Sequence, residues 1–330
     1  MSSELERLLS QIKSECAHDV VAPPTQAVTV FTGVEALDDA LSEIYNPSNN
    51  SCRSPPPPLF ELLGQTASGK TQTLYHICAT IAMPRCLAGH EGHVLFVDID
   101  GKASPRILAH HMLHQAPTTT SEATITRALQ RVHFFAPSST QSLIATLALL
   151  PKYVRDRDIT PAALLIDGLG CNYWADRKEA AHIRLRSKRV TPFFRLQQLL
   201  VDTLQMVHQR LACLAVAASL LLLPALDNTP SKPPEQEPYS ASSCSEEPSS
   251  QPQPLEYRDH MIQRWSSLVT RSFVLDSACV EPSSSSRSAL TRVTFTPSSS
   301  HRRHQSQPAS KPLSYTAYIG PHGLRRTTAN

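Results

Sequence analysis

The sequence contains one motif whose residue types and spacing are specific for phosphate binding. Residues 64–71, GQTASGKT, fit the pattern GxxxxGK[ST], with the apolar run LFELL before it and a helix-like stretch after it. In such a loop the backbone N–H groups wrap a phosphate, the lysine reaches the β- and γ-phosphates, and the last hydroxyl ligates Mg²⁺. The motif predicts a site for ATP and Mg²⁺, and a loop that keeps the shape without turnover is the main alternative. The predicted binding residues are Gly64, Gln65, Thr66, Ala67, Ser68, Gly69, Lys70 and Thr71.

Carboxylates follow two of the predicted strands. Asp167 ends the apolar run AALLID, and Asp98 and Asp100 end the run HVLFVDID. A carboxylate at the carboxyl end of a neighbouring strand can hold Mg²⁺ or its water shell, which is the role predicted for Asp167 beside Thr71. Asp98 or Asp100 could orient or deprotonate the attacking water, but capping of the turn before Gly101 explains these residues equally well.

A basic segment follows the Asp167 strand. Residues 182–189 read HIRLRSKR and contain no acidic residue. Such a segment can contact nucleic-acid phosphates, and a solvated helix face is an equally good explanation. The candidate DNA-binding residues are Arg184, Arg186, Lys188 and Arg189.

Composition limits the class of protein. The net charge is only +3 over 330 residues, so the chain as a whole is not a polycation. The eight cysteines form no CxxC pair and the first residues are charged, which predicts a reducing, intracellular location. The longest apolar run, Leu211 to Leu223, is too short to span a bilayer and predicts a buried strand, so no membrane association is expected.

Strand and helix patterns alternate along the chain. Because continuous apolar strands alternate with helices, we expect an α/β fold with a mostly parallel twisted sheet, helices on both faces and an antiparallel edge. Thr32 and Glu35 predict a capping box for the second helix. Helices are predicted over 3–13, 33–42, 71–82, 105–115, 122–130, 140–150 and about 193–210; strands over 59–63, 93–100, 131–137, 162–167, within 211–223, and over 269–276, 290–296 and 314–320.

The composition also changes along the chain. Residues 1–58 are predicted to form an N-terminal helix and linker, and residues 59–223 the nucleotide-binding core. Residues 224–256 are rich in Pro, Ser and Glu and cannot bury enough apolar surface to fold, so a disordered insertion is expected. Residues 257–330 are predicted to add the last strands together with disordered basic segments.

Several motifs in their order resemble the RecA-type recombinases of eukaryotes. These are TGVEALDDAL, GQTASGKTQTLYH, VLFVDIDG followed by PRIL, and ALLID. The stretch LLIDGLGCNYWADR is more specific and is similar to recombinase paralogues, whereas the phosphate loop is common to a large superfamily. The resemblance covers about residues 3–223 with gaps, and more faintly the last strands.

This resemblance implies a RecA-like P-loop NTPase core that binds ATP and Mg²⁺ at Lys70, Thr71 and Asp167. It implies a nuclear role in homologous recombination repair of DNA double-strand breaks. The partners would be other recombinase paralogues, in a hetero-oligomer that promotes recombinase filaments on single-stranded DNA. Weak binding of single-stranded or branched DNA is also implied. The small helical DNA-binding domain that precedes the core in the full recombinase is not expected here.

The chain departs from the recombinase pattern at its active site. The family's catalytic Glu falls at Asp100, one methylene shorter, and its nucleotide-sensing Asn-Gln pair falls near Ser219 and Leu220 and is absent. Ala67 stands where the recombinase has a basic residue, and the insertion replaces the second DNA-binding loop. We therefore expect at most slow, DNA-linked ATP hydrolysis. The alternatives are a structural subunit with a vestigial nucleotide site and, less favoured, a small-molecule kinase, for which the sequence shows no clear lid.

Overall fold

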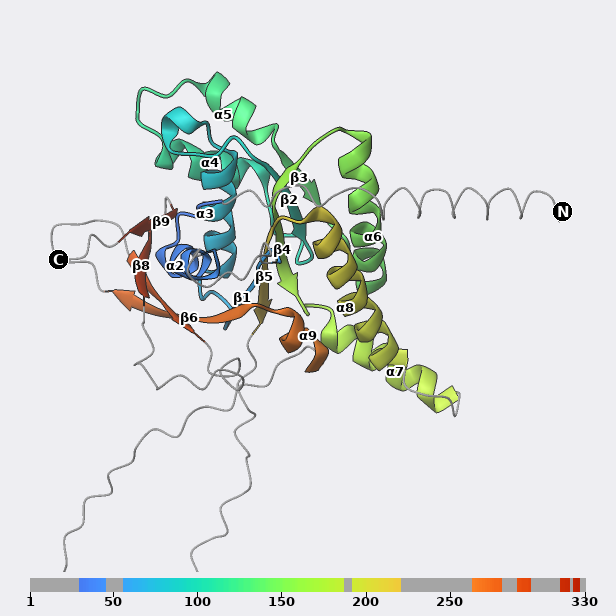
Figure 1. The fold of residues 1–330 in the computed structure, drawn as a ribbon. Coiled ribbons are helices and arrows are strands. Elements are labelled where there is room, and N and C mark those ends of the chain that lie inside the picture. Colours follow the sequence, from blue (N-terminus) through green and yellow to red (C-terminus); the bar gives the residue numbers. More distant parts are fainter. Residues whose placement is uncertain are drawn as a thin grey trace, which may run out of the picture.

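A single nine-stranded sheet organises the chain, with the strand order β3-β2-β4-β5-β1-β6-β7-β8-β9 (Figure 1). The structure, a computed structural model, describes residues 30–45, 56–186, 192–220, 263–280, 290–297, 315–320 and 323–326. The predicted helix over 3–13 and the predicted insertion over 224–256 lie outside these residues.

The sheet is parallel over six strands and antiparallel at one edge. The strands β1 to β6 pair in parallel, and β7 to β9 extend the sheet beyond β6 in antiparallel order. The predicted mostly parallel α/β fold is therefore confirmed. Strand β9 was not predicted because four residues carry little pattern. The strands are β1 Leu59–Gly64, β2 His93–Asp98, β3 Val132–Phe135, β4 Pro161–Leu169, β5 Leu214–Leu220, β6 Arg271–Val280, β7 Leu290–Pro297, β8 Tyr315–Gly320 and β9 Gly323–Arg326.

Helices cover both faces of the parallel half (Figure 1). The strand β2 shows why: Val94 and Phe96 join one apolar cluster, and Leu95 and Val97 join the other, because side chains alternate along a strand. The first cluster packs under α2 Glu35–Ile44, α3 Lys70–Ala82, α4 Pro105–Gln115 and α5 Glu122–Leu129. The second packs under α6 Thr140–Asp156, α8 Pro192–Leu211 and α9 Gln263–Leu268, while α7 spans Tyr173–Arg186 and a 3-10 turn spans Arg85–Leu87.

Local sequence determines several helix starts. Helix α4 begins with Pro105, whose fixed φ suits the first helical position. Helix α6 begins with a capping box in which Ser139 and Ser142 exchange hydrogen bonds. These starts agree with the sequence-based prediction, since caps depend on residues only three positions apart.

The start of α2 differs from the predicted capping box. The N-cap residue is Val34, and no side chain caps the helix there. Instead the Asp38 carboxylate accepts hydrogen bonds from the Thr32 backbone (2.6 Å), the Thr32 hydroxyl (2.7 Å) and the Gly33 backbone (3.1 Å). The prediction of Thr32 paired with Glu35 was wrong because an acid in the first turn reaches back to the same donors.

Two boundaries also differ. Helix α6 was predicted to end at 150 but continues through Pro151 to Asp156. Proline removes one backbone donor, yet the helix persists where its apolar side packs on the sheet. The apolar run from Leu211 is split, since Leu211 ends α8 and β5 begins at Leu214.

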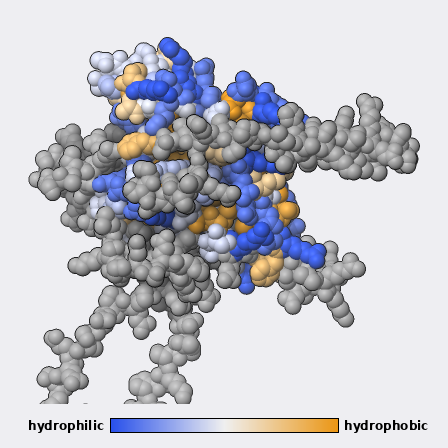
Figure 2. Space-filling view, viewed as in Figure 1, coloured by the Kyte–Doolittle hydropathy of each residue, from blue (hydrophilic) through white to orange (hydrophobic). Residues whose placement is uncertain are grey.

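The described surface is largely hydrophilic, with scattered apolar patches (Figure 2). The large apolar side chains that remain exposed include Leu149 on α6, Trp174 on α7, and Phe194 and Leu199 on α8. Among the described residues, no helix combines the length and apolar character needed to cross a membrane.

A buried carboxylate in the central strand joins three elements. Glu61 in β1 is 2% exposed. The Trp265 indole N–H donates to its Oε1 at 2.6 Å, and the Ser272 hydroxyl donates to its Oε2 at 2.9 Å. A buried charge requires such donors, so Glu61 fixes α9 and β6 against β1.

We predict that Trp265→Phe lowers the free energy of unfolding by about 1–3 kcal/mol, because the variant keeps an aromatic ring but leaves Oε1 without its indole donor. Urea denaturation followed by circular dichroism measures the change. The matched control is Trp174→Phe, at a ring that is 56% exposed, where a change within about 0.5 kcal/mol is expected. Equal losses of stability in the two variants would contradict the role assigned to the indole donor.

Candidate nucleotide-binding site

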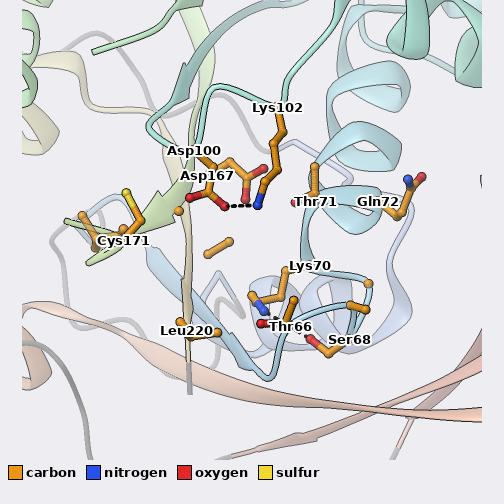
Figure 3. A pocket seen from close by; sticks show the side chains of 15 residues that line it. Thr66, Ser68, Lys70, Thr71, Gln72, Asp100, Lys102, Asp167, Cys171 and Leu220 are labelled. Atoms are coloured by element: carbon orange, nitrogen blue, oxygen red, sulfur yellow. Dashed lines mark hydrogen bonds and ion pairs between the residues drawn. The ribbon is translucent and has the colours of Figure 1, made fainter. Parts of the chain in front are cut away.

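The candidate site lies where neighbouring strands end at the same edge of the sheet. The strand registers pair Gly64 with Leu220, and Asp98 with Asp167. Because parallel strands share one carboxyl edge, residues from β1, β5, β4 and β2 meet there. A cavity of about 580 Å³ opens at this edge and is lined by residues 66–72 with Asp100, Lys102, Asp167 and others (Figure 3).

The phosphate loop connects β1 to α3 in a conformation that requires small residues. A Cβ on Gly64 would come within 2.3 Å of the Ser68 hydroxyl and 2.8 Å of the Leu275 carbonyl. Gly69 precedes α3 with a φ of 92°, in the left-handed region that favours glycine, and Ala67 also has a positive φ of 63°. The loop thus aims the first N–H groups of α3 at the cavity, as anion binding requires.

Lys70 is folded back over this loop. Its ammonium donates to the Gly64 carbonyl at 2.8 Å, the Gln65 carbonyl at 2.7 Å and the Ser68 hydroxyl at 3.3 Å. Burial lowers the pKa of Lys70 to about 8, although Asp167 and Asp100 oppose the shift. A nearby phosphate would favour the charged form, so the lysine is well placed to answer an arriving anion.

Asp167 is buried at the end of β4 and suits a metal ion. It is 3% exposed, it hydrogen-bonds with the Thr71 hydroxyl, and its Oδ2 has no hydrogen-bond partner among the described residues. Burial raises the pKa of Asp167 to about 6, and the charges of Asp98 and Asp100 add to the shift. An unpartnered buried carboxylate oxygen beside a hydroxyl is the oxygen donor set that Mg²⁺ takes, so Thr71 and Asp167 fit the predicted metal.

The structure distinguishes Asp98 from Asp100. Asp98 is buried and accepts hydrogen bonds from the backbones of Gly101 (3.0 Å) and Ala103 (2.6 Å), so it caps the turn. Asp100 lines the cavity and pairs with Lys102 at 3.0 Å. Of the two alternatives, Asp100 has the position of a water-orienting residue, and its catalytic role stays a prediction.

Several cavity residues were not found from the sequence. Lys102 follows the β2 strand by a few positions, and only its place after DIDG could have marked it. Cys171 lines the cavity and hydrogen-bonds with Asp100; burial raises the pKa of its thiol to about 12. Leu220 presents an apolar side chain to the cavity, where the sequence had already predicted that a sensing pair is absent.

The candidate DNA-binding residues lie at the end of α7 and beyond it. Arg184 and Arg186 fall in the last turn of α7, whose backbone alone is described. Lys188 and Arg189 lie outside the described residues. Contact with DNA through these four residues stays a prediction.

A phosphate loop on β1, with a carboxylate at the end of a strand two places away in a mostly parallel sheet, defines a RecA-like fold. The sequence model of the Rad51 family matches residues 25–204, which is more than half of the chain. The protein therefore belongs to the Rad51 family.

The similar proteins agree with this assignment. The DNA repair protein XRCC2 of Mus musculus is 31% identical over 119 residues, covering 36% of this chain and 42% of that protein. The meiotic recombination protein DMC1 homolog of Arabidopsis thaliana is 30% identical over 87 residues, covering 26% of this chain and 23% of that protein. The chain thus spans less than half the length of these relatives.

A solved structure shares the fold. The crystal structure of the RadB recombinase matches with a TM-score of 0.51 at 17% identity, covering 90% of this chain and 99% of that one. At this identity the match establishes the RecA-like fold, in agreement with the sequence-based prediction.

We predict that Asp167→Asn stabilises the nucleotide-free protein near neutral pH. Because the folded-state pKa is raised, Asp167 contributes stability below pH 4 that is lost as the pH rises through about 6. The wild type should therefore lose on the order of 1 kcal/mol between about pH 5 and pH 8, and the Asn variant should lack this component.

Urea denaturation across this pH range measures the effect, with exposed Asp156→Asn as the control. Parallel pH profiles for the wild type and Asp167→Asn would show that the buried carboxylate carries no such penalty.

Proposed function

We propose that the protein binds ATP with Mg²⁺ and assists homologous recombination repair of DNA double-strand breaks. We infer that it acts in the nucleus, as a subunit of a recombinase paralogue hetero-oligomer that promotes filament formation on single-stranded DNA. The observation that carries the nucleotide part is the buried pair of Thr71 and Asp167 facing the phosphate loop in one cavity. The family and its relatives in repair and recombination support the wider role.

The residues divide the work at the proposed site. Lys70 would exchange its loop carbonyls for the β- and γ-phosphates, while the N–H groups at the start of α3 hold the phosphate chain. Bound Mg²⁺ would neutralise part of the phosphate charge, with Thr71 and Asp167 as its protein ligands. Asp100 would orient water, but its side chain is short and engaged by Lys102 and Cys171, which favours slow hydrolysis.

Two alternatives make different predictions. A structural subunit with a vestigial site would not respond to nucleotide at all. A small-molecule kinase needs basic residues that close over the transferred phosphate, and the described residues lining the cavity include no arginine. The recombinase paralogue therefore remains the better-supported proposal.

Lys70→Ala should weaken binding of MgATP at least about tenfold, because the variant lacks a charge-assisted bond to the phosphates. Isothermal titration calorimetry on the full chain measures the affinity, and exposed Lys152→Ala serves as the control. An affinity unchanged by Lys70→Ala would remove the phosphate loop from the proposed function.

For DNA, we expect weak, salt-sensitive binding that does not depend on sequence. Changing Arg184, Arg186, Lys188 and Arg189 together to Ser should lower the log–log salt slope by about 0.7 for each phosphate of a single strand that no longer meets a cation. Fluorescence anisotropy of labelled oligonucleotides at several salt concentrations measures the slope. If the slope stays the same, the basic segment is a solvated face and DNA is held by partner subunits.

A further inference from the structure

A second lysine enters the cavity from the wall opposite the phosphate loop. Lys102 lies in the loop between β2 and α4, and its ammonium is 3.0 Å from Oδ2 of Asp100 (Figure 3). Among the described residues that line the cavity, Lys70 and Lys102 are the two cations. The charge of Lys102 contributes to the lowered pKa of Lys70, so both ammonium groups act on the same space.

The pair of Lys102 and Asp100 is suited to exchange. The Lys102 side chain is 71% exposed and that of Asp100 is 36% exposed. An ion pair so open to water shifts an equilibrium by no more than about fivefold, so a competing anion can displace it. A terminal phosphate carries more charge and more acceptor oxygens than a carboxylate and is therefore the stronger partner for an ammonium.

The strand order indicates which phosphate would reach Lys102. The sheet runs β2-β4-β5-β1, so the phosphate loop after β1 and the Lys102 loop after β2 stand on opposite sides of Asp167. Phosphates that extend from the loop towards Thr71 and Asp167 bring their terminal member nearest to Lys102. The strand between, β5, offers only the apolar Leu220 to the cavity at its end.

We propose that Lys102 recognises the terminal phosphate of ATP by giving up its ion pair with Asp100, so that the site prefers ATP to ADP. This inference rests on the proposed nucleotide-binding function. It makes Lys102 a specificity-determining residue: the γ-phosphate takes over the ammonium and leaves the Asp100 carboxylate available to water. With ADP, Lys102 keeps its partner, and Asp100 stays engaged.

Calorimetric titration of the full chain with MgATP and with MgADP tests the proposal. Lys102→Ala should weaken ATP binding about 3- to 10-fold, the range for one charge-assisted hydrogen bond, and change ADP binding less than about twofold. Lys102→Arg should restore most of the ATP preference, because it keeps the charge. Exposed Lys152→Ala, outside the cavity lining, should change neither affinity.

A double-mutant cycle tests the exchange itself. Asp100→Asn should raise the ratio of ATP to ADP affinity in the wild-type background, because it frees Lys102, and should leave that ratio unchanged when Lys102 is already Ala. Equal weakening of ATP and ADP by Lys102→Ala, or no weakening, overturns the proposal. A wild-type chain that binds neither nucleotide overturns the proposed function as well, so the two failures are distinguishable.

Discussion

The parallel pairing of β4 with β2 and β5 is the constraint on which the candidate site depends. It brings the carboxyl ends of three strands to one edge and sets Asp167 beside Asp98 in register. The phosphate loop joins the same edge because β1 pairs with β5 in the same direction. One hydrogen-bonding pattern therefore collects residues from distant parts of the chain into a single cavity.

That cavity holds ionisable groups under opposing demands. Burial disfavours the charged forms of both Lys70 and Asp167, which lowers the pKa of the lysine and raises that of the carboxyl group. Each charge is tolerated because a phosphate loop and a metal site need charges where water is scarce. The same edge therefore combines local instability with binding capacity, which is common at functional sites.

The last strands are connected to the site as well as to the core. Strand β6 pairs with β1 in parallel and places the Leu275 carbonyl against Gly64 at the start of the phosphate loop. Glu61, earlier in β1, receives hydrogen bonds from Trp265 and Ser272. The C-terminal segment thus supports the strand that carries the loop, although it lies about two hundred residues further along the chain.

Much of the protein could be predicted from residues close together in the sequence. The pattern of residues 64–71 identified the phosphate loop, and apolar periodicity predicted the helices and most strands, because both depend on interactions within a few positions. Contacts between distant segments could not be predicted in this way. Whether Asp98 or Asp100 faces the cavity depends on which backbone donors the β2–α4 turn presents. The pairing of Lys102 with Asp100 beside Asp167, and of Glu61 with Trp265, exists only after the strands have assembled, because no local pattern records which side chains will share a buried edge.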